Sequence, residues 1–361
     1  MIDFYDAEFH FPLDLQVYRN LPGHERPRPP ARRMKRQVRA AGWMSTAEVI
    51  FTPDFFRIRA CPQKLLGSWN SWGTEDLREY VSLTAPLVLQ ELGHRVTDDQ
   101  EASIAAGEYR LSEVHITRAF HLVNYSQQEF IRRLFYAIAE SHRPHWAKRG
   151  EGIVINGDNR RVSAYLYAKD QEFIAKGWPA YQDWLGAAET DERPGIALSR
   201  NSHLLAALLG PRLEFRFGDQ FFRQNPLAQG SEWRPRRAAK LYERELQRLK
   251  LPASVNVMWR RDQAREILTP AQYSSLRLWH HGEPLQSLGS PSTVKRHVAA
   301  IREALGIDIR QPSASLVGSQ RRLDVASVLS TENTLNMPGD TDDGDNQELL
   351  FREVSRILSE R

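Results

Sequence analysis

Two tyrosines and a lysine lie close together in the segment 160–172. Polar and apolar residues alternate from Val162, so Tyr165 and Tyr167 share one face of an expected strand, and Lys169 follows at its end. A phenol beside a cation suits attack on a phosphodiester, because the cation favours the phenolate and stabilises charge on the phosphoryl oxygens. The same pattern also fits a half-buried strand with an aromatic solvent face, since tyrosine is favoured in strands.

A second alternating segment, 212–217, places Arg212, Glu214 and Arg216 on one face and apolar residues on the other. A carboxylate between two arginines predicts either a ladder of ion pairs or a site that binds metal and phosphate together. Ion pairs are the commoner case.

A third strand is expected in the segment 112–123. His115, Thr117 and His121 fall on one of its faces, and Arg118 falls on the opposite, apolar face. The two histidines are six residues apart, roughly 20 Å along a strand, so they cannot share one metal ion. Either could separately be a ligand or a structural residue.

Composition indicates a two-domain protein that is compatible with a polyanionic partner. The chain has 361 residues, 41% of them hydrophobic. The segment 331–361 holds eight acidic and three basic residues, which leaves 46 basic and 37 acidic residues elsewhere, a formal charge of +9. Cys61 is the single cysteine, which fits a reducing cytoplasm. The sequence shows neither a transmembrane stretch nor a secretion signal, so we expect a cytoplasmic protein without a membrane partner.

The remaining elements of the first 250 residues follow from periodicity and turn residues. The run Pro62–Leu77 is expected to hold a turn, with Thr74 capping the helix that follows. The other expected features are a strand in 1–20, a basic proline-rich loop in 21–40 that either contacts phosphates or is merely solvated, a strand-like stretch in 43–59, and helices in 126–140, 170–186 and 232–250.

A separate C-terminal module is expected in 251–330. Thr269 and Ser290 begin two capped helices, and the second has a buried apolar stripe. The segment 306–309 is expected to form a tight turn that leads into a strand. Two helices followed by a strand predict either a winged helix-turn-helix that reads DNA or a plain helical hairpin. The outward face of the second helix carries Thr293, Lys295, Arg296, His297 and Arg302. Residues 331–361 are expected to be an acidic, disordered tail, with a short amphipathic helix around 349–358.

Five of these segments resemble the gene II/X family of replication initiators of filamentous bacteriophages. The resemblance covers residues 1 to about 250, and the helix-turn-helix is also similar to members of the family. It implies an α+β fold like that of rolling-circle nickases: a nicking domain in 1–250 with a mostly antiparallel sheet and helices packed on one side, then the winged module. The matching segments are Met1-Ile2-Asp3, Pro62–Leu77, Thr117-Arg118, Tyr167–Glu172 and Arg212–Arg216.

The resemblance implies a site-specific DNA-nicking and strand-joining enzyme. In the family, a tyrosine in a Tyr-x-Lys-x-x-Glu context becomes linked to a DNA 5′ phosphate, the free 3′ hydroxyl primes rolling-circle synthesis, and the displaced circle is later religated. By position, Tyr167 is the expected nucleophile, with Lys169 and Glu172 as its motif partners. Tyr165 is the alternative nucleophile.

The resemblance further implies a divalent metal, Mg²⁺ or Mn²⁺, with His121, Glu214 and Asp76 as candidate ligands. Relatives tend to carry an acidic residue two positions after Arg118, where this chain has Phe120, so the sequence departs from the family pattern there. The expected partners are double- and single-stranded phage DNA at the origin and host replication proteins. Besides the outward residues of the C-terminal module, the expected DNA contacts are Arg212, Arg216, Arg118, Lys64 and Asn70. For Arg118, the alternative is a structural ion pair.

Two other functions fit the same sequence. A DNA-binding repressor would use the basic body and the helix-turn-helix without any chemistry. An RNA-binding structural protein would stack bases on Trp69, Trp72 and the two strand tyrosines.

Overall fold

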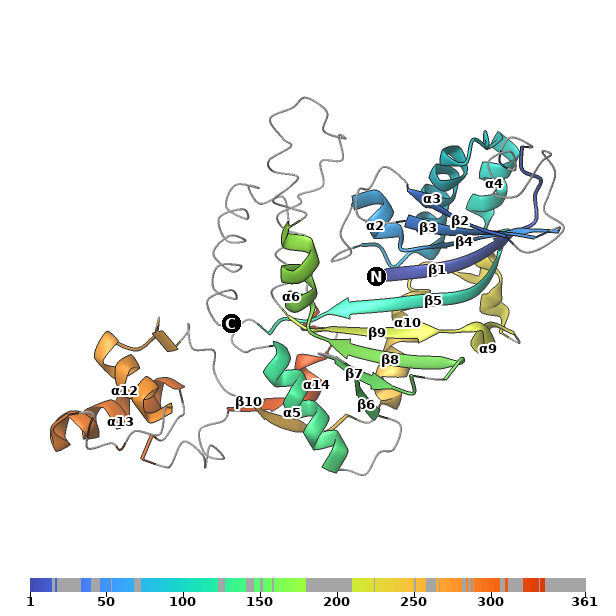
Figure 1. Cartoon of the computed structure of the whole chain (residues 1–361). Helices are drawn as coiled ribbons and strands as arrows, with labels where there is room; N and C mark the ends of the chain where they lie inside the picture. Colours follow the sequence, from blue (N-terminus) through green and yellow to red (C-terminus); the bar gives the residue numbers. More distant parts are fainter. Residues whose placement is uncertain are drawn as a thin grey trace, which may run out of the picture.

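The computed structural model shows an α+β protein built on one large sheet (Figure 1). The structure describes residues 1–14, 17, 34–39, 46–52, 54–67, 73–122, 127–140, 146–149, 152–157, 159–179, 210–223, 225–249, 251–257, 264–265, 267–280, 284, 287, 289–305, 309–310, 321–330 and 332–334.

Among these residues, nine strands form an antiparallel sheet in the order β2-β3-β4-β1-β5-β9-β8-β7-β6. Strand β5 is central, because it pairs with β1 on one side and with β9 on the other. The strands are β1 Ile2–Phe9, β2 Met34–Arg39, β3 Thr46–Phe51, β4 Phe56–Ala60, β5 Arg110–Ala119, β6 Trp146–Arg149, β7 Gly152–Ile155, β8 Val162–Tyr167 and β9 Arg212–Phe217.

The pairing register separates an apolar face of the sheet from a polar one. Residues directly opposite each other on paired strands point to the same face. Phe215 is opposite both Ile116 and Ala164, and all three are buried in the main hydrophobic core. Glu214, one residue earlier, is opposite Thr117 and Tyr165, so these side chains lie on the other face.

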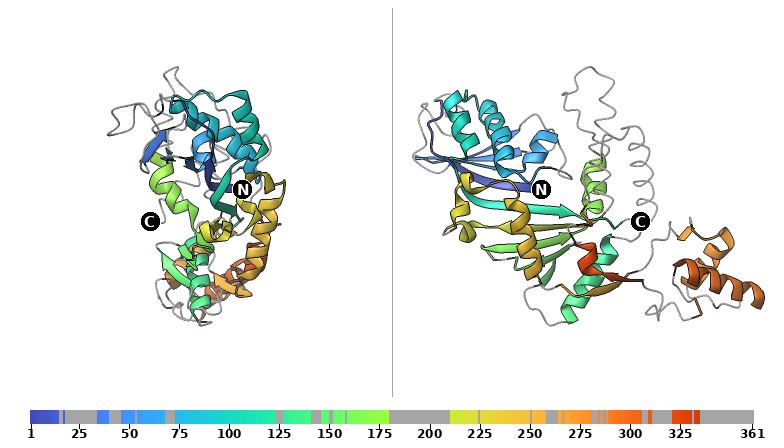
Figure 2. Two further views of the ribbon diagram at one scale, coloured as in Figure 1. Left: turned by 90° about the vertical axis from the view of Figure 1, so that its right-hand side faces the viewer. Right: turned by 180° about the vertical axis from the view of Figure 1, so that it is seen from behind.

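Helices α3 (Leu77–Glu91) and α10 (Arg237–Arg248) cover the apolar face, and both lie on the same side of the sheet in Figure 2. From α3, the Thr84 hydroxyl is 2.7 Å from that of Tyr5 on β1. From α10, Tyr242 packs edge-on against Phe215, with ring centroids 5.0 Å apart. The other helical elements of this body are α2 Pro62–Gly67, α4 Asp98–Ala106, α5 Gln127–Glu140, α6 Lys169–Glu172, the π-helix η1 Phe173–Gly177, α9 Asp219–Phe222, and the 3-10 turns η2 Pro226–Ala228 and η3 Gly230–Glu232.

Helices α12 (Pro270–His280) and α13 (Pro291–Leu305) form a second hydrophobic cluster of their own, with Leu276, Val298 and Ile301 at its centre. Strands β10 (Ser254–Val257) and β11 (Arg321–Asp324) flank this helical pair in the sequence and pair with each other. After β11, helix α14 (Val325–Val328) joins the main core instead. The helical module is therefore an insertion between two paired strands of the main body.

The α+β class, the antiparallel sheet and the strands in 1–20, 112–123, 160–172 and 212–217 agree with the sequence analysis. The basic segment 21–40 was expected to be a loop, but its end forms β2, because Met34–Arg39 pairs along the whole length of β3. The run Pro62–Leu77 begins with α2, which was not expected, and residues 68–70 of the expected Gly-Ser-Trp-Asn turn lie outside the described residues. The N-cap of α3 is Asp76, not Thr74, because the Asp76 carboxylate accepts the free N–H groups of the first turn.

The strand of the expected wing is not confirmed. Ile309 and Arg310 form a turn, and β11, the next strand that the structure describes, pairs with β10. The tail after residue 334 and its expected amphipathic helix lie outside the described residues. Over the part of the chain that is described, no helix has both the length and the apolar character needed to cross a bilayer.

Candidate active site

Tyr167 is the last residue of β8, and Lys169 is the first residue of α6. The register of β8 with β9 places Tyr165 opposite Glu214 and Tyr167 opposite Arg212. The sheet thus brings the tyrosine segment and the Arg-Glu-Arg segment together on its polar face, although 44 residues separate Tyr167 from Arg212 in the sequence.

The Tyr167 hydroxyl donates a hydrogen bond of 3.4 Å to Glu214 Oε2, which is long for a bond of this type. Lys169 Nζ lies 5.9 Å from the centroid of the Tyr167 ring. Lys169 is only 1% exposed, whereas the Tyr167 ring is half-buried. The phenol therefore has a carboxylate and a buried cation as neighbours, and it remains accessible from solvent.

Tyr165 has a different neighbour, the guanidinium of Arg216, whose central carbon lies 3.8 Å from the ring centroid. Arg216 also donates from Nε to Glu214 Oε1, and its side chain is 38% exposed. This stacked arrangement holds Tyr165 by its ring and leaves the guanidinium at the surface of the polar face.

Glu214 lies between two cations and is only 3% exposed. Its Oε1 is 3.2 Å from His115 Nδ1 and also accepts from Arg216. Burial on its own would raise the pKa of Glu214, but the hydrogen bonds and charges of His115 and Arg216 outweigh it and hold that pKa far below its usual range. Glu214 is thus a fixed, ionised hydrogen-bond acceptor rather than a strong base.

His115 connects Glu214 to a longer row of charges. Its Nε2 is 2.8 Å from Glu113 Oε1. Burial would lower the pKa of His115, but its bonds to Glu113 and Glu214 prevail, so the pKa is raised. From Glu113 the row continues through Arg59 to Asp6 and Glu48. We call this row the charge chain; its members are Arg216, Glu214, His115, Glu113, Arg59, Asp6 and Glu48.

Several residues expected to contact DNA lie inside the protein. Arg212 is 1% exposed, with its Nη2 3.8 Å from Asp3. Arg118 is on the apolar face, 6% exposed, and forms ion pairs with Glu75 and Glu243. Lys64 is half-buried in α2, and Asn70 lies outside the described residues. Glu172 is the last residue of α6, but its side chain is not among those described.

The three candidate metal ligands do not converge. The Asp76 carboxylate accepts from the backbone N–H groups of Arg78 and Glu79 at the start of α3. His121 lies beyond the end of β5, four residues and therefore about 13 Å from Thr117, the residue opposite Glu214. Among the described residues, no group of three or more His, Cys, Asp or Glu side chains is arranged to hold a metal ion.

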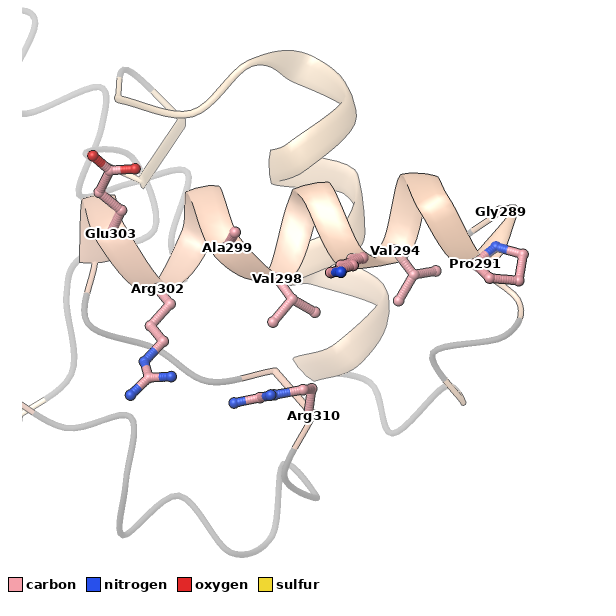
Figure 3. Close-up of a pocket in the computed structure, with 9 residues that line it drawn as sticks. Gly289, Pro291, Val294, Val298, Ala299, Arg302, Glu303 and Arg310 are labelled. Carbon is pink, nitrogen blue, oxygen red and sulfur yellow. The ribbon is translucent and has the colours of Figure 1, made fainter.

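On α13, Lys295, Arg296 and Arg302 are exposed, as the sequence analysis expected, and Thr293 is half-buried. His297 was expected on the outward face but is buried, with its Nδ1 2.8 Å from the Ser275 hydroxyl on α12. A hollow runs along the exposed side of α13, where Val294, Val298 and Arg302 lie on the side of Arg310 (Figure 3).

His115 lies on the face expected from the sequence, but no partner was predicted for it, and Glu113 was not singled out. Alternation along β5 shows only that His115, Glu113 and Thr117 share a face. Their pairing with Glu214 depends on the register between β5 and β9, which no local pattern contains.

The comparisons with known proteins give one match. Residues 51–236, more than half of the chain, match the family model for the N-terminal part of the replication-associated protein of phage gene II. This span includes Tyr167, Lys169, Glu214 and His115. No curated protein and no solved structure matches the chain. The chain therefore belongs to the gene II family of phage replication initiators.

Proposed function

We propose that this protein initiates rolling-circle replication by nicking one strand of phage DNA at the origin, with Tyr167 as the nucleophile. The observation that carries this proposal is the surroundings of Tyr167, a half-buried residue of the polar face whose hydroxyl contacts the Glu214 carboxylate and whose ring lies near the buried Lys169 ammonium. Family membership supports the same activity.

In the proposed reaction, the Tyr167 oxygen loses its proton to solvent and forms a bond to phosphorus. The bond from phosphorus to the 3′ oxygen breaks, and that oxygen takes up a proton. The product is a 5′-phosphotyrosine and a free 3′ hydroxyl, and the reverse reaction rejoins the strand. The Lys169 charge favours the phenolate, Glu214 orients the hydroxyl before it ionises, and the exposed guanidinium of Arg216 is placed to hold a phosphate oxygen.

Tyr165 is the less suitable nucleophile, because its ring is stacked under Arg216 and no described contact joins its hydroxyl to Glu214. A pair of matched variants tests this assignment. Tyr167→Phe should abolish the covalent adduct with supercoiled DNA that carries the origin, while DNA binding persists. Tyr165→Phe keeps the ring that Arg216 covers and should retain the adduct. Loss of the adduct in Tyr165→Phe alone would make Tyr165 the nucleophile, and an adduct in both variants would refute the proposal.

The divalent metal is a separate prediction, which comes from the family resemblance. Because Asp76 and His121 do not converge on Glu214, we assign no step of the reaction to a metal. Chelation with EDTA tests the prediction directly. We expect it to abolish cleavage and spare DNA binding if an ion takes part, and full cleavage in EDTA would contradict the metal prediction.

The exposed cations of α13 support a second part of the proposal, that the α12–α13 module binds duplex DNA next to the cleavage site. A non-catalytic repressor would use the same surface. It would be indifferent to Tyr167→Phe, so the variant separates the two functions.

A further inference from the structure

The proposed reaction gives no role to His115, a buried member of the charge chain. Both nitrogens of its buried imidazole lie against carboxylates, Nδ1 at 3.2 Å from Glu214 and Nε2 at 2.8 Å from Glu113. Phe4 packs against one side of the ring, with centroids 4.7 Å apart. A histidine that donates from both nitrogens is an imidazolium cation.

We infer that His115 is a positioning residue for strand cleavage: its imidazolium, braced by Glu113, fixes Glu214 beneath the Tyr167 hydroxyl and cancels the carboxylate charge where a phosphate must approach. This inference rests on the proposed role of Tyr167.

The first argument is electrostatic. Glu214 accepts from the Tyr167 hydroxyl, so an uncompensated carboxylate would repel both the phenolate that forms there and the incoming phosphodiester. Two cations contact Glu214, and their side chains differ in how exposed they are to solvent. Arg216 is 38% exposed and can turn toward a phosphate, whereas the His115 side chain is 11% exposed and enclosed by the sheet. His115 therefore keeps Glu214 neutralised when Arg216 engages DNA.

The second argument is geometric. Glu113 uses Oε1 for His115 and Oε2 for Arg59, 3.2 Å away, so the acceptor behind the imidazole is itself held from the far side. Such a support fixes the ring orientation and, through it, the position of the Glu214 carboxylate. Arg59, Glu113 and His115 thus connect β4 to Glu214 on β9, and none of the three is given a contact with the substrate.

Two substitutions test the inference. His115→Asn removes the cation and keeps one amide donor, and His115→Gly leaves a space that added imidazole can fill. The matched control is His94→Asn, because His94 is also buried, with its nitrogens 3.0 Å from Asp14 and Gln100 in a different part of the protein. The measurements are the single-turnover rate of adduct formation on supercoiled origin DNA, the DNA dissociation constant, the melting temperature, and the divalent-ion concentration that gives half-maximal cleavage.

We expect the adduct rate of both His115 variants to fall at least about 10-fold, with the dissociation constant changed less than about threefold. Imidazole should restore much of the rate of His115→Gly and none in His94→Asn. An unchanged rate, or a loss that imidazole does not restore, would overturn the inference. A shift of the half-maximal ion concentration in His115→Asn would also overturn it, because it would make His115 a metal ligand. If Tyr167→Phe still formed the adduct, the proposed function itself would have failed.

Discussion

Arg118 tests whether a cation on the apolar face of the sheet stabilises the fold instead of binding DNA. Its guanidinium lies on the apolar face, 4.7 Å from the centroid of the Tyr242 ring, with carboxylates of Glu75 and Glu243 at 3.2 and 3.7 Å. Replacing it with methionine keeps most of the apolar volume of the side chain but removes the charge. We expect Arg118→Met to destabilise the fold without weakening DNA binding by the folded protein.

The magnitude follows from these three contacts. A desolvated cation–π contact contributes about 2 kcal/mol. The two ion pairs contribute about 0.5–1 kcal/mol each, because Glu75 and Glu243 are 34% and 46% exposed and remain hydrated after the substitution. The loss should be about 3–4 kcal/mol, at the lower end of the cost of breaking a fully buried pair.

Urea unfolding followed by tryptophan fluorescence measures this loss, and fluorescence anisotropy with labelled duplex DNA measures binding. The control is Arg160→Met, which removes a surface pair with Asp219 and should cost less than about 1 kcal/mol. A stability change in Arg118→Met no larger than in the control, together with weaker DNA binding, would refute the structural assignment of Arg118.

Three further predictions concern a turn, a titration and the exposed cations of α13. Gly93 and Gly107 both have left-handed φ angles, 84° and 82°, but of the two only Gly107 has backbone close to where a Cβ would lie, with Ser231 N 2.4 Å away. In urea unfolding, Gly93→Ala should therefore lower the free energy of unfolding by about 1 kcal/mol, and Gly107→Ala should lower it distinctly more. Equal losses would contradict the packing at Gly107. Glu113 and Glu214 raise the folded-state pKa of His115, so the contribution of His115 to the stability of the fold is complete below the unfolded pKa of about 6.5 and is lost as pH rises through the folded pKa. The difference in unfolding free energy between wild type and His115→Gln should therefore shrink over that pH interval. A difference that grows with pH would show that the pKa is shifted in the opposite direction. Replacing the exposed Lys295 and Arg296 with glutamine should weaken DNA binding. It should also reduce, by about two, the slope of the logarithm of the DNA association constant against the logarithm of the salt concentration. An unchanged slope would show that this face of α13 does not contact phosphates.

The strands that form the site could be predicted from sequence because alternation is a local property. Polar and apolar residues alternate in segments 162–167 and 212–217, so the faces of Tyr165, Tyr167 and Glu214 followed directly. Helix starts with a capping box were equally local, as at Thr269, whose side chain and backbone exchange hydrogen bonds with Gln272.

What the sequence could not supply was the partner of each strand. The charge chain exists because β9 pairs with β5 in one register, which sets His115 beside Arg216 and Glu214. Among the expected metal ligands, Asp76 caps helix α3, because a carboxylate is as well suited to accept the free N–H groups of a helix start as to bind a metal ion. His297 was expected on the outer face of α13, but it lies beside Val298 of the apolar stripe and is buried with its Nδ1 2.8 Å from the Ser275 hydroxyl.

The paired strands β10 and β11 have an architectural consequence. The chain departs toward α12 and α13 after Val257 and returns at Arg321, and these two residues are register partners in the ladder. The points where the chain leaves and re-enters the main body are therefore adjacent, and the β10–β11 pairing joins the two ends of the inserted segment. A stem of this kind allows the residues between β10 and β11 to be lengthened, shortened or exchanged while the nine-stranded sheet keeps its connectivity.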